Sequence, residues 1–152
     1  MTRGRGSVSI VAEPGVRLRP DDREALPTWM RGALLATAVM NALAAILFVP
    51  AAQALRALAG LPEPEHPIYL ATVALFVLLF AIGYLLVGLS GRAERLFIGL
   101  AAAGKISFVT LVAWYWTTGA LPLRAFLAAT GDLAFGAAFA WWLWNTRTSR
   151  RS

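Results

Sequence analysis

The stretch IYLATVALFVLLFAIGYLLVGLSG, residues 68–91, decides the fold, because it contains no charged side chain from end to end. A helix needs about 20 mostly apolar residues to cross the hydrocarbon core of a bilayer. Three further segments are comparably apolar: 32–49 has no charge, 96–123 contains only Lys105, and 125–146 contains only Asp132. The sequence therefore predicts an all-α protein with four transmembrane helices.

Helix-breaking and polar residues separate these segments. Pro50 follows the first, a loop rich in proline and glycine fills 51–67, and short polar turns occupy 90–95 and 117–122. Short connections make consecutive helices antiparallel neighbours. We therefore expect an antiparallel four-helix bundle. Its predicted spans are about 30–49, 68–90, 96–116 and 122–144, within a transmembrane domain of 28–146, flanked by a flexible basic tail at 1–27 and a basic tail at 147–152.

Composition supports a membrane protein and excludes several functions. Hydrophobic residues make up 59% of the chain and charged residues 14%, against roughly 25% charged in soluble domains. The absence of cysteine excludes disulfides, thiol catalysis and cysteine-ligated metals. A net charge of +6 could suit nucleic acid. The arginines, however, lie in the tails and loops, where membrane proteins place them for topology. We expect the lipid bilayer to be the partner, and no nucleic acid.

The arginines also predict the orientation. With a cytoplasmic N-terminus, every arginine except Arg56 and Arg124 lies on the cytoplasmic side. This is the positive-inside pattern, so both termini are predicted to be cytoplasmic, in the inner membrane of a bacterium. Aromatic residues that favour the headgroup layer stand at the predicted span ends: Trp29, Tyr69, Trp114, Tyr115, Trp116, Trp141, Trp142 and Trp144.

An alternative stays open for the first span. Arg31, the apolar run 33–48 and the motif Ala52-Gln53-Ala54 together resemble a signal peptide with a small-residue cleavage site. Cleavage there would leave three helices. The long segment before the run and the polar Asn41 within it favour a retained helix.

Lys105 and Asp132 are the candidate site. At a rise of about 1.5 Å per residue, both lie within about 3 Å of one depth, near the middle of adjacent antiparallel helices. A lone charge there costs about 2.5–3.5 kcal/mol on insertion scales, so opposite charges at equal depth predict a pair. Asn41 falls at a similar depth in the first span, and Tyr84 is the polar group of the second. We expect Asn41, Lys105 and Asp132 to converge inside the bundle, whereas Tyr84 lies toward the cytoplasmic half of its span.

The pair has two interpretations. It can be structural, fixing helix register, since polar contacts in membranes contribute only about 0.6 kcal/mol on average. It can be functional, lining a cavity for a proton, an ion or a small polar ligand. We predict no catalytic residues, no cofactor and no metal site, because His66 is the only histidine and stands in a polar loop with only Glu63 and Glu65 nearby.

Several short motifs resemble those of small bacterial four-helix membrane proteins of uncharacterised activity, loosely comparable to DoxX-like proteins. The motifs are Gly60-Leu61-Pro62, Pro67-Ile68-Tyr69, Ile82-Gly83-Tyr84, Arg92 with Arg95, Gly104-Lys105, and Gly131-Asp132-Leu133-Ala134-Phe135. The resemblance covers about residues 29–146. It implies a four-helix bundle and leaves the activity undefined.

Two function classes follow from these observations. The first is a non-enzymatic protein built around the Lys105–Asp132 pair, either a small-solute or proton-linked carrier or a membrane accessory subunit. A carrier this small is expected to act as a homo-oligomer, and an accessory subunit as part of a larger membrane complex. The alternative is an integral membrane enzyme or lipid-modifying factor that uses the same polar cluster, although no nucleophile–base set supports it.

Overall fold

A computed structural model describes residues 25–148, and the predictions made for residues 1–24 and 149–152 lie outside this range. The described residues form five helices: α1 (Thr28–Leu47), α2 (Gln53–Ala59), α3 (Pro67–Ser90), α4 (Arg95–Thr117) and α5 (Leu123–Thr148). Helices α1, α3, α4 and α5 are long and apolar enough to cross a membrane. The four predicted spans are thereby confirmed as helices, and the fold is compatible with a multi-pass integral membrane protein.

The loop predicted at 51–67 was wrong in one part, because α2 lies within it. Its sequence QALRALA consists of good helix formers, which outweigh its short length. The helix ends at Gly60, whose φ of 74° is the left-handed conformation that glycine adopts at helix ends. The first span also ends earlier than predicted, at Leu47, and a turn occupies the residues before α2.

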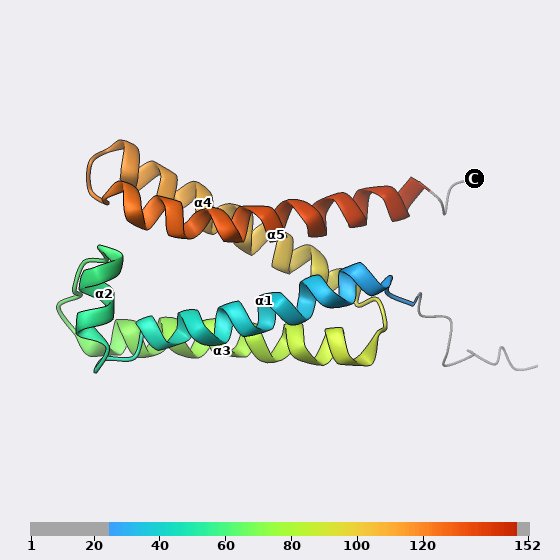
Figure 1. Cartoon of the computed structure of the whole chain (residues 1–152), viewed down its shortest axis with the longest axis horizontal. Helices are drawn as coiled ribbons and strands as arrows, with labels where there is room; N and C mark the ends of the chain where they lie inside the picture. The colour runs from blue at the N-terminus through green and yellow to red at the C-terminus, as the bar shows by residue number, and fades with distance from the viewer. Residues whose placement is uncertain (1–24, 149–152) are drawn as a thin grey trace, which may run out of the picture.

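The long helices pack as two pairs. Helix α1 lies alongside α3, and α4 lies alongside α5, with α2 beside the end of α1 (Figure 1). Glycines allow close approach within each pair: a Cβ atom at Gly88 would lie 2.9 Å from the Leu35 side chain, and one at Gly136 would lie 3.2 Å from Lys105 Cβ. Small residues at membrane helix contacts serve the same purpose generally.

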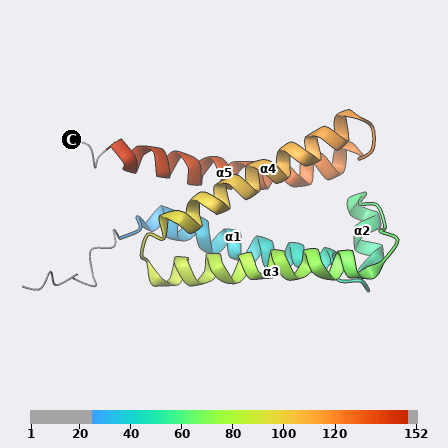
Figure 2. The same ribbon diagram turned by 180° about the vertical axis from the view of Figure 1, so that it is seen from behind.

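The two pairs pack together mainly at one end. A buried cluster there joins all four long helices, and its members include Met30 and Leu34 of α1, Tyr84 of α3, Ile98 of α4 and Phe139 of α5. Toward the α2 end the pairs diverge (Figures 1 and 2), and the buried cluster of Val109, Val112 and Ala129 belongs to α4 and α5 alone. The chain is therefore closed at the end near both termini and held less tightly at the other.

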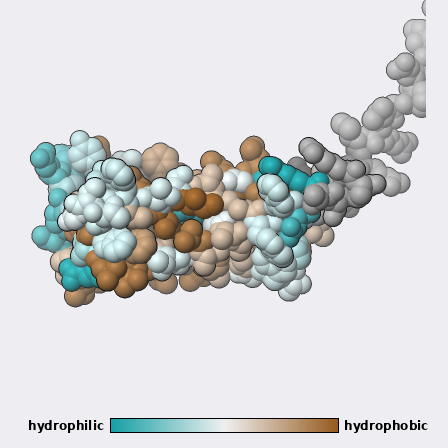
Figure 3. Space-filling model, turned by 90° about the horizontal axis from the view of Figure 1, so that it is seen from above, coloured by the Kyte–Doolittle hydropathy of each residue, from teal (hydrophilic) through white to brown (hydrophobic). Residues whose placement is uncertain are grey.

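The outer faces of the long helices carry large apolar side chains. Leu79, Leu86, Leu100 and Leu127 are each more than half exposed. In Figure 3 the hydrophilic residues gather toward the two ends of the molecule, and tan to brown residues lie between them. This apolar middle zone matches the hydrocarbon layer that a spanning helix bundle must face.

Arginines from neighbouring helices cover most of the helix C-termini. The last carbonyls of a helix have no partner within it, and they carry the negative end of the helix dipole. Arg31 of α1 donates to the Gly88 carbonyl of α3 at 3.2 Å, and Arg124 of α5 donates to the Ala57 carbonyl of α2 at 3.3 Å. Arg95 of α4 donates to the Leu143 carbonyl of α5 at 3.1 Å, but this carbonyl lies inside the helix, which runs on to Thr148.

Arg56 of α2 is the most extensively bonded of these arginines. Its side chain donates to the carbonyls of Leu47, Val49 and Pro50 just past the end of α1, at 2.7–3.1 Å, and makes a bidentate ion pair with Glu63 at 2.8 and 2.9 Å. Only 1% of the residue is exposed. Arg56 was predicted only to lie on the non-cytoplasmic side, and in the structure it joins the end of α1, α2 and the loop that contains Glu63.

One predicted interfacial tryptophan is buried. Trp142 is only 3% exposed and lies 5.3 Å under the Arg95 guanidinium, inside the cluster that joins the helices. Trp29 and Trp141, by contrast, are exposed and lie next to each other, with ring centroids 5.7 Å apart. Their position at the end of the molecule near the termini agrees with the interfacial role predicted for them.

The close contact at Gly88 gives a test of the α1–α3 pairing. Changing Gly88 to leucine places a side chain against Leu35 and Leu34, and we expect a loss of about 1–3 kcal/mol from overpacking. The control is Gly104→Leu, because no heavy atom lies within 4 Å of a Cβ there. Thermal unfolding in lipid nanodiscs should show a lower midpoint only for Gly88→Leu. Equal midpoints for the two variants would contradict this pairing.

Candidate functional site

Lys105 is a buried lysine near the centre of a membrane-length helix. Helix α4 runs from Arg95 to Thr117, and Lys105 lies about ten residues from its start, too far for the ammonium group to reach the helix end. Only 6% of the residue is exposed. A charged group at this depth must find partners within the protein, because the hydrocarbon around the helix offers none.

The structure gives Lys105 a partner from each of the other three long helices. Its Nζ forms an ion pair with Asp132 Oδ1 of α5 and donates to Asn41 Oδ1 of α1 at 3.4 Å. It also lies 5.6 Å from the ring centroid of Tyr84 of α3, within the range of a cation–π interaction. All four residues predicted as the candidate site therefore meet, with one from each long helix.

The aromatic partner is held in place by other rings. Tyr84 is 2% exposed and packs edge-on against Phe97 of α4, with centroids 5.3 Å apart, and against Phe139 of α5 at 6.0 Å. Because these neighbours come from the other helix pair, the ring is fixed between the pairs. The face that it offers to Lys105 is thus a preorganised surface for a cation.

The two charges of the ion pair have unequal surroundings. The Lys105 side chain is 6% exposed, whereas that of Asp132 is 22% exposed. Lys105 has Asn41 and Tyr84 as further partners, and among residues 25–148 Asp132 has Lys105 alone. Asp132 is therefore the less enclosed member of the pair and the one that can exchange its partner more easily.

A buried hydroxyl on α1 has no hydrogen bond among the described residues. Thr37 is fully buried, and its Oγ1 has no partner within the described part of the chain. Thr37 precedes Asn41 by one helical turn, so the two side chains share a face of α1. The contact of Gly88 with Leu34 and Leu35 sets the antiparallel register, and it places Thr37 about level with Tyr84. A buried polar atom without a partner costs roughly 1–3 kcal/mol, which makes this position suited to a bound polar group.

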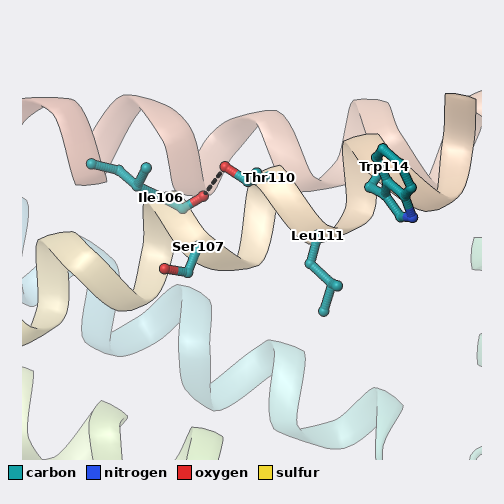
Figure 4. A pocket seen from close by; sticks show the side chains of 5 residues that line it. All are labelled: Ile106, Ser107, Thr110, Leu111 and Trp114. Atoms are coloured by element: carbon teal, nitrogen blue, oxygen red, sulfur yellow. Dashed lines mark hydrogen bonds between the residues drawn. The ribbon is translucent and has the colours of Figure 1, made fainter.

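The groove drawn in Figure 4 is a different feature. It has a volume of about 420 Å³ and is lined by five residues of α4: Ile106, Ser107, Thr110, Leu111 and Trp114. Lys105, Val109 and Val112 lie on the buried face of the same helix. At about 100° per residue, the groove lies on the opposite side of α4 from Lys105. None of the four residues of the polar cluster lines this groove.

No protein-family model, curated protein or solved structure matches this chain. What the site can do must therefore be argued from its own residues.

Two residues matter that the sequence analysis did not select as site residues. Thr37 is one of them, and the signal that the sequence lacks is its complete burial. Arg124 was used only to predict the orientation, and its bond to α2 depends on a helix that was not predicted. His66 caps α3, where its Nδ1 accepts from the Ile68 backbone N–H at 3.2 Å. Among residues 25–148 no group of three or more metal-ligating side chains is found.

The cluster has limited chemical capability. It offers one ammonium, one carboxylate, one amide and two hydroxyls, on side chains from four helices. This set can bind a proton at the carboxylate or a small polar solute beside the ion pair. It can also simply hold the two helix pairs in register.

Proposed function

We propose that this chain is a multi-pass protein of the bacterial cytoplasmic membrane, with both termini cytoplasmic, and that it is a proton-linked carrier of a small solute. The observation that carries the proposal is that Lys105 contacts three polar side chains, one from each of the other long helices. Ionisable residues inside membrane proteins commonly mark the paths of ions, protons and substrates.

The packing supports a role in which the helix pairs move. Each pair has its own tight internal contacts, whereas the pairs meet mainly in one buried cluster at the end near the termini. The polar cluster lies where the pairs begin to diverge, and it includes a hydrogen bond between them from Lys105 to Asn41. Small changes at this cluster can therefore bias how two otherwise rigid units are arranged.

The proposal includes an oligomeric state for the carrier. A transport path needs more surface than four helices enclose, so the carrier acts as a homo-oligomer. The second candidate is an accessory subunit of a larger membrane complex, in which the Lys105–Asp132 pair holds the helices in register. The resemblance to small bacterial four-helix proteins, including DoxX-like proteins, suits either role.

The proposal is tested in liposomes that contain a trapped pH-indicator dye. Concentration jumps of small anions, small cations and neutral polar solutes are applied in turn to wild type and to the Lys105→Leu/Asp132→Leu double variant. We expect at least one solute to change the internal pH with wild type and not with the double variant, which lacks the binding groups but carries no unpaired charge.

Identical responses of the two proteins to every solute and to an imposed pH gradient would rule out the carrier. Co-purification of wild type with a larger complex from native membranes would then support the accessory subunit.

A further inference from the structure

The asymmetry of the ion pair indicates which charge remains when the pair opens. Lys105 keeps two partners that favour its charged form, the Asn41 carbonyl oxygen at 3.4 Å and the Tyr84 ring at 5.6 Å. Asp132 loses its only partner among the described residues and is also the more exposed side chain. When the pair opens, Lys105 therefore keeps contacts that suit a cation, whereas Asp132 keeps none among the described residues.

A positive charge left at mid-depth needs an anion. An unpaired charge near the bilayer centre is costly, and a small anion beside Lys105 restores a neutral cluster. The protonated Asp132 can donate a hydrogen bond to the same anion, and the unpartnered Thr37 hydroxyl provides a further donor on the facing helix.

The exposed Arg124, which lies at the α2 end of the molecule, also suits an anion. Arg124 is exposed and stands on α5 about 12 Å from Asp132 along the helix axis. It bonds the Ala57 carbonyl of α2 where the helix pairs diverge, whereas Arg56 nearby is neutralised by Glu63. An anion that approaches from this end meets an arginine without a carboxylate partner among the described residues, and then Lys105.

We propose that the solute is a small monovalent anion carried together with one proton. This inference rests on the proposed carrier function and names its substrate class. The proton binds the Asp132 carboxylate, the anion takes the place of that carboxylate on the Lys105 ammonium, and Lys105 keeps its proton throughout. One anion and one proton enter and leave together, so the site is neutral when empty and when loaded.

The charged and titratable groups that face Asp132 are few. Helix α4 contributes Lys105 and α3 contributes Tyr84, whereas α1 contributes the neutral Asn41 and Thr37. Arg124, two turns away, is the nearest charged residue on the same helix. A pH effect on anion binding near neutral or acidic pH is thus assigned to Asp132.

The first test uses Asp132→Asn, which mimics the protonated carboxyl group. Thermal unfolding in nanodiscs is measured in sulfate and then in formate, nitrate or chloride at equal ionic strength. We expect one or more of the monovalent anions to raise the midpoint of Asp132→Asn by about 3 °C or more. The Lys105→Leu/Asp132→Leu variant, which has no ammonium, should show no such rise.

A second arm uses wild type, so that the test does not depend on a variant that folds poorly. The anions should stabilise wild type more at acidic pH than at neutral pH, because protonation of Asp132 frees Lys105. Equal anion effects on Asp132→Asn and on the double variant, or stabilisation of wild type by small organic cations instead, would overturn the inference. If anions stabilise the protein but no solute changes the internal pH of the liposomes, the anion site is supported and the carrier function is refuted.

Discussion

Changing Lys105 alone to leucine is expected to destabilise the protein by about 2–3 kcal/mol, because it leaves the Asp132 carboxylate unpaired within the membrane. Asp132→Leu should be damaging for the converse reason, but less so, since Asn41 and Tyr84 still stabilise the lysine. The double change removes both charges and should return stability to within about 1 kcal/mol of wild type, given how little such contacts contribute on average.

The test compares the unfolding midpoints and yields of wild type, the two single variants and the double variant in one lipid. If the double variant is no more stable than the worse single variant, Lys105 and Asp132 do not neutralise each other. Each would then face water or a neighbouring subunit, and both the carrier proposal and the anion inference would lose their basis. The charge-conserving swap Lys105→Asp/Asp132→Lys is a useful further control, because it retains the pair but removes the lysine from Asn41 and Tyr84.

Changing Arg56 to alanine is expected to be the most damaging change outside the polar cluster. The variant loses three hydrogen bonds to carbonyls near the end of α1 and leaves the Glu63 carboxylate without its partner. Truncating one member of a buried ion pair typically costs about 3–5 kcal/mol, and Glu63 is 40% exposed, so we expect about 3 kcal/mol.

Arg56→Lys serves as the matched control for this second prediction. Lysine keeps the charge but cannot make the bidentate bond, so its unfolding midpoint should fall between those of wild type and Arg56→Ala. Limited proteolysis of the 50–66 segment should accelerate in the same order. A midpoint for Arg56→Ala equal to wild type would show that these bonds contribute nothing to stability.

The sequence predicted the helices and the members of the polar cluster because both depend on short-range rules. Uninterrupted apolar length predicts a spanning helix, and residue depth along antiparallel helices brought Lys105 level with Asp132. Asn41 and Tyr84 could be selected because each is a polar side chain in an otherwise apolar span. In the structure Lys105 contacts Asp132, Asn41 and Tyr84, and the role of these side chains stays a proposal.

The arrangement of the helix pairs could not be predicted in the same way. Small residues such as Gly83, Gly88, Gly131 and Gly136 occur on several helices, so each helix has more than one face suited to packing. Helix α2 is too short for a periodic signal and stands among prolines. The structural role of Arg56 was hidden for the same reason, since an arginine in a loop is usually solvated.

The arginines bond helix ends mainly within their own hairpin. Arg31 covers the end of α3 and Arg56 covers the end of α1, so the first hairpin satisfies both of its own long-helix termini. Within the second hairpin, Arg95 donates to the Leu143 carbonyl of α5. If the proposed membrane location holds, each hairpin has these contacts before it meets the other hairpin. Arg124 and Lys105 then act as couplings that join two completed halves, and the two proposed movable parts are also the two units of synthesis.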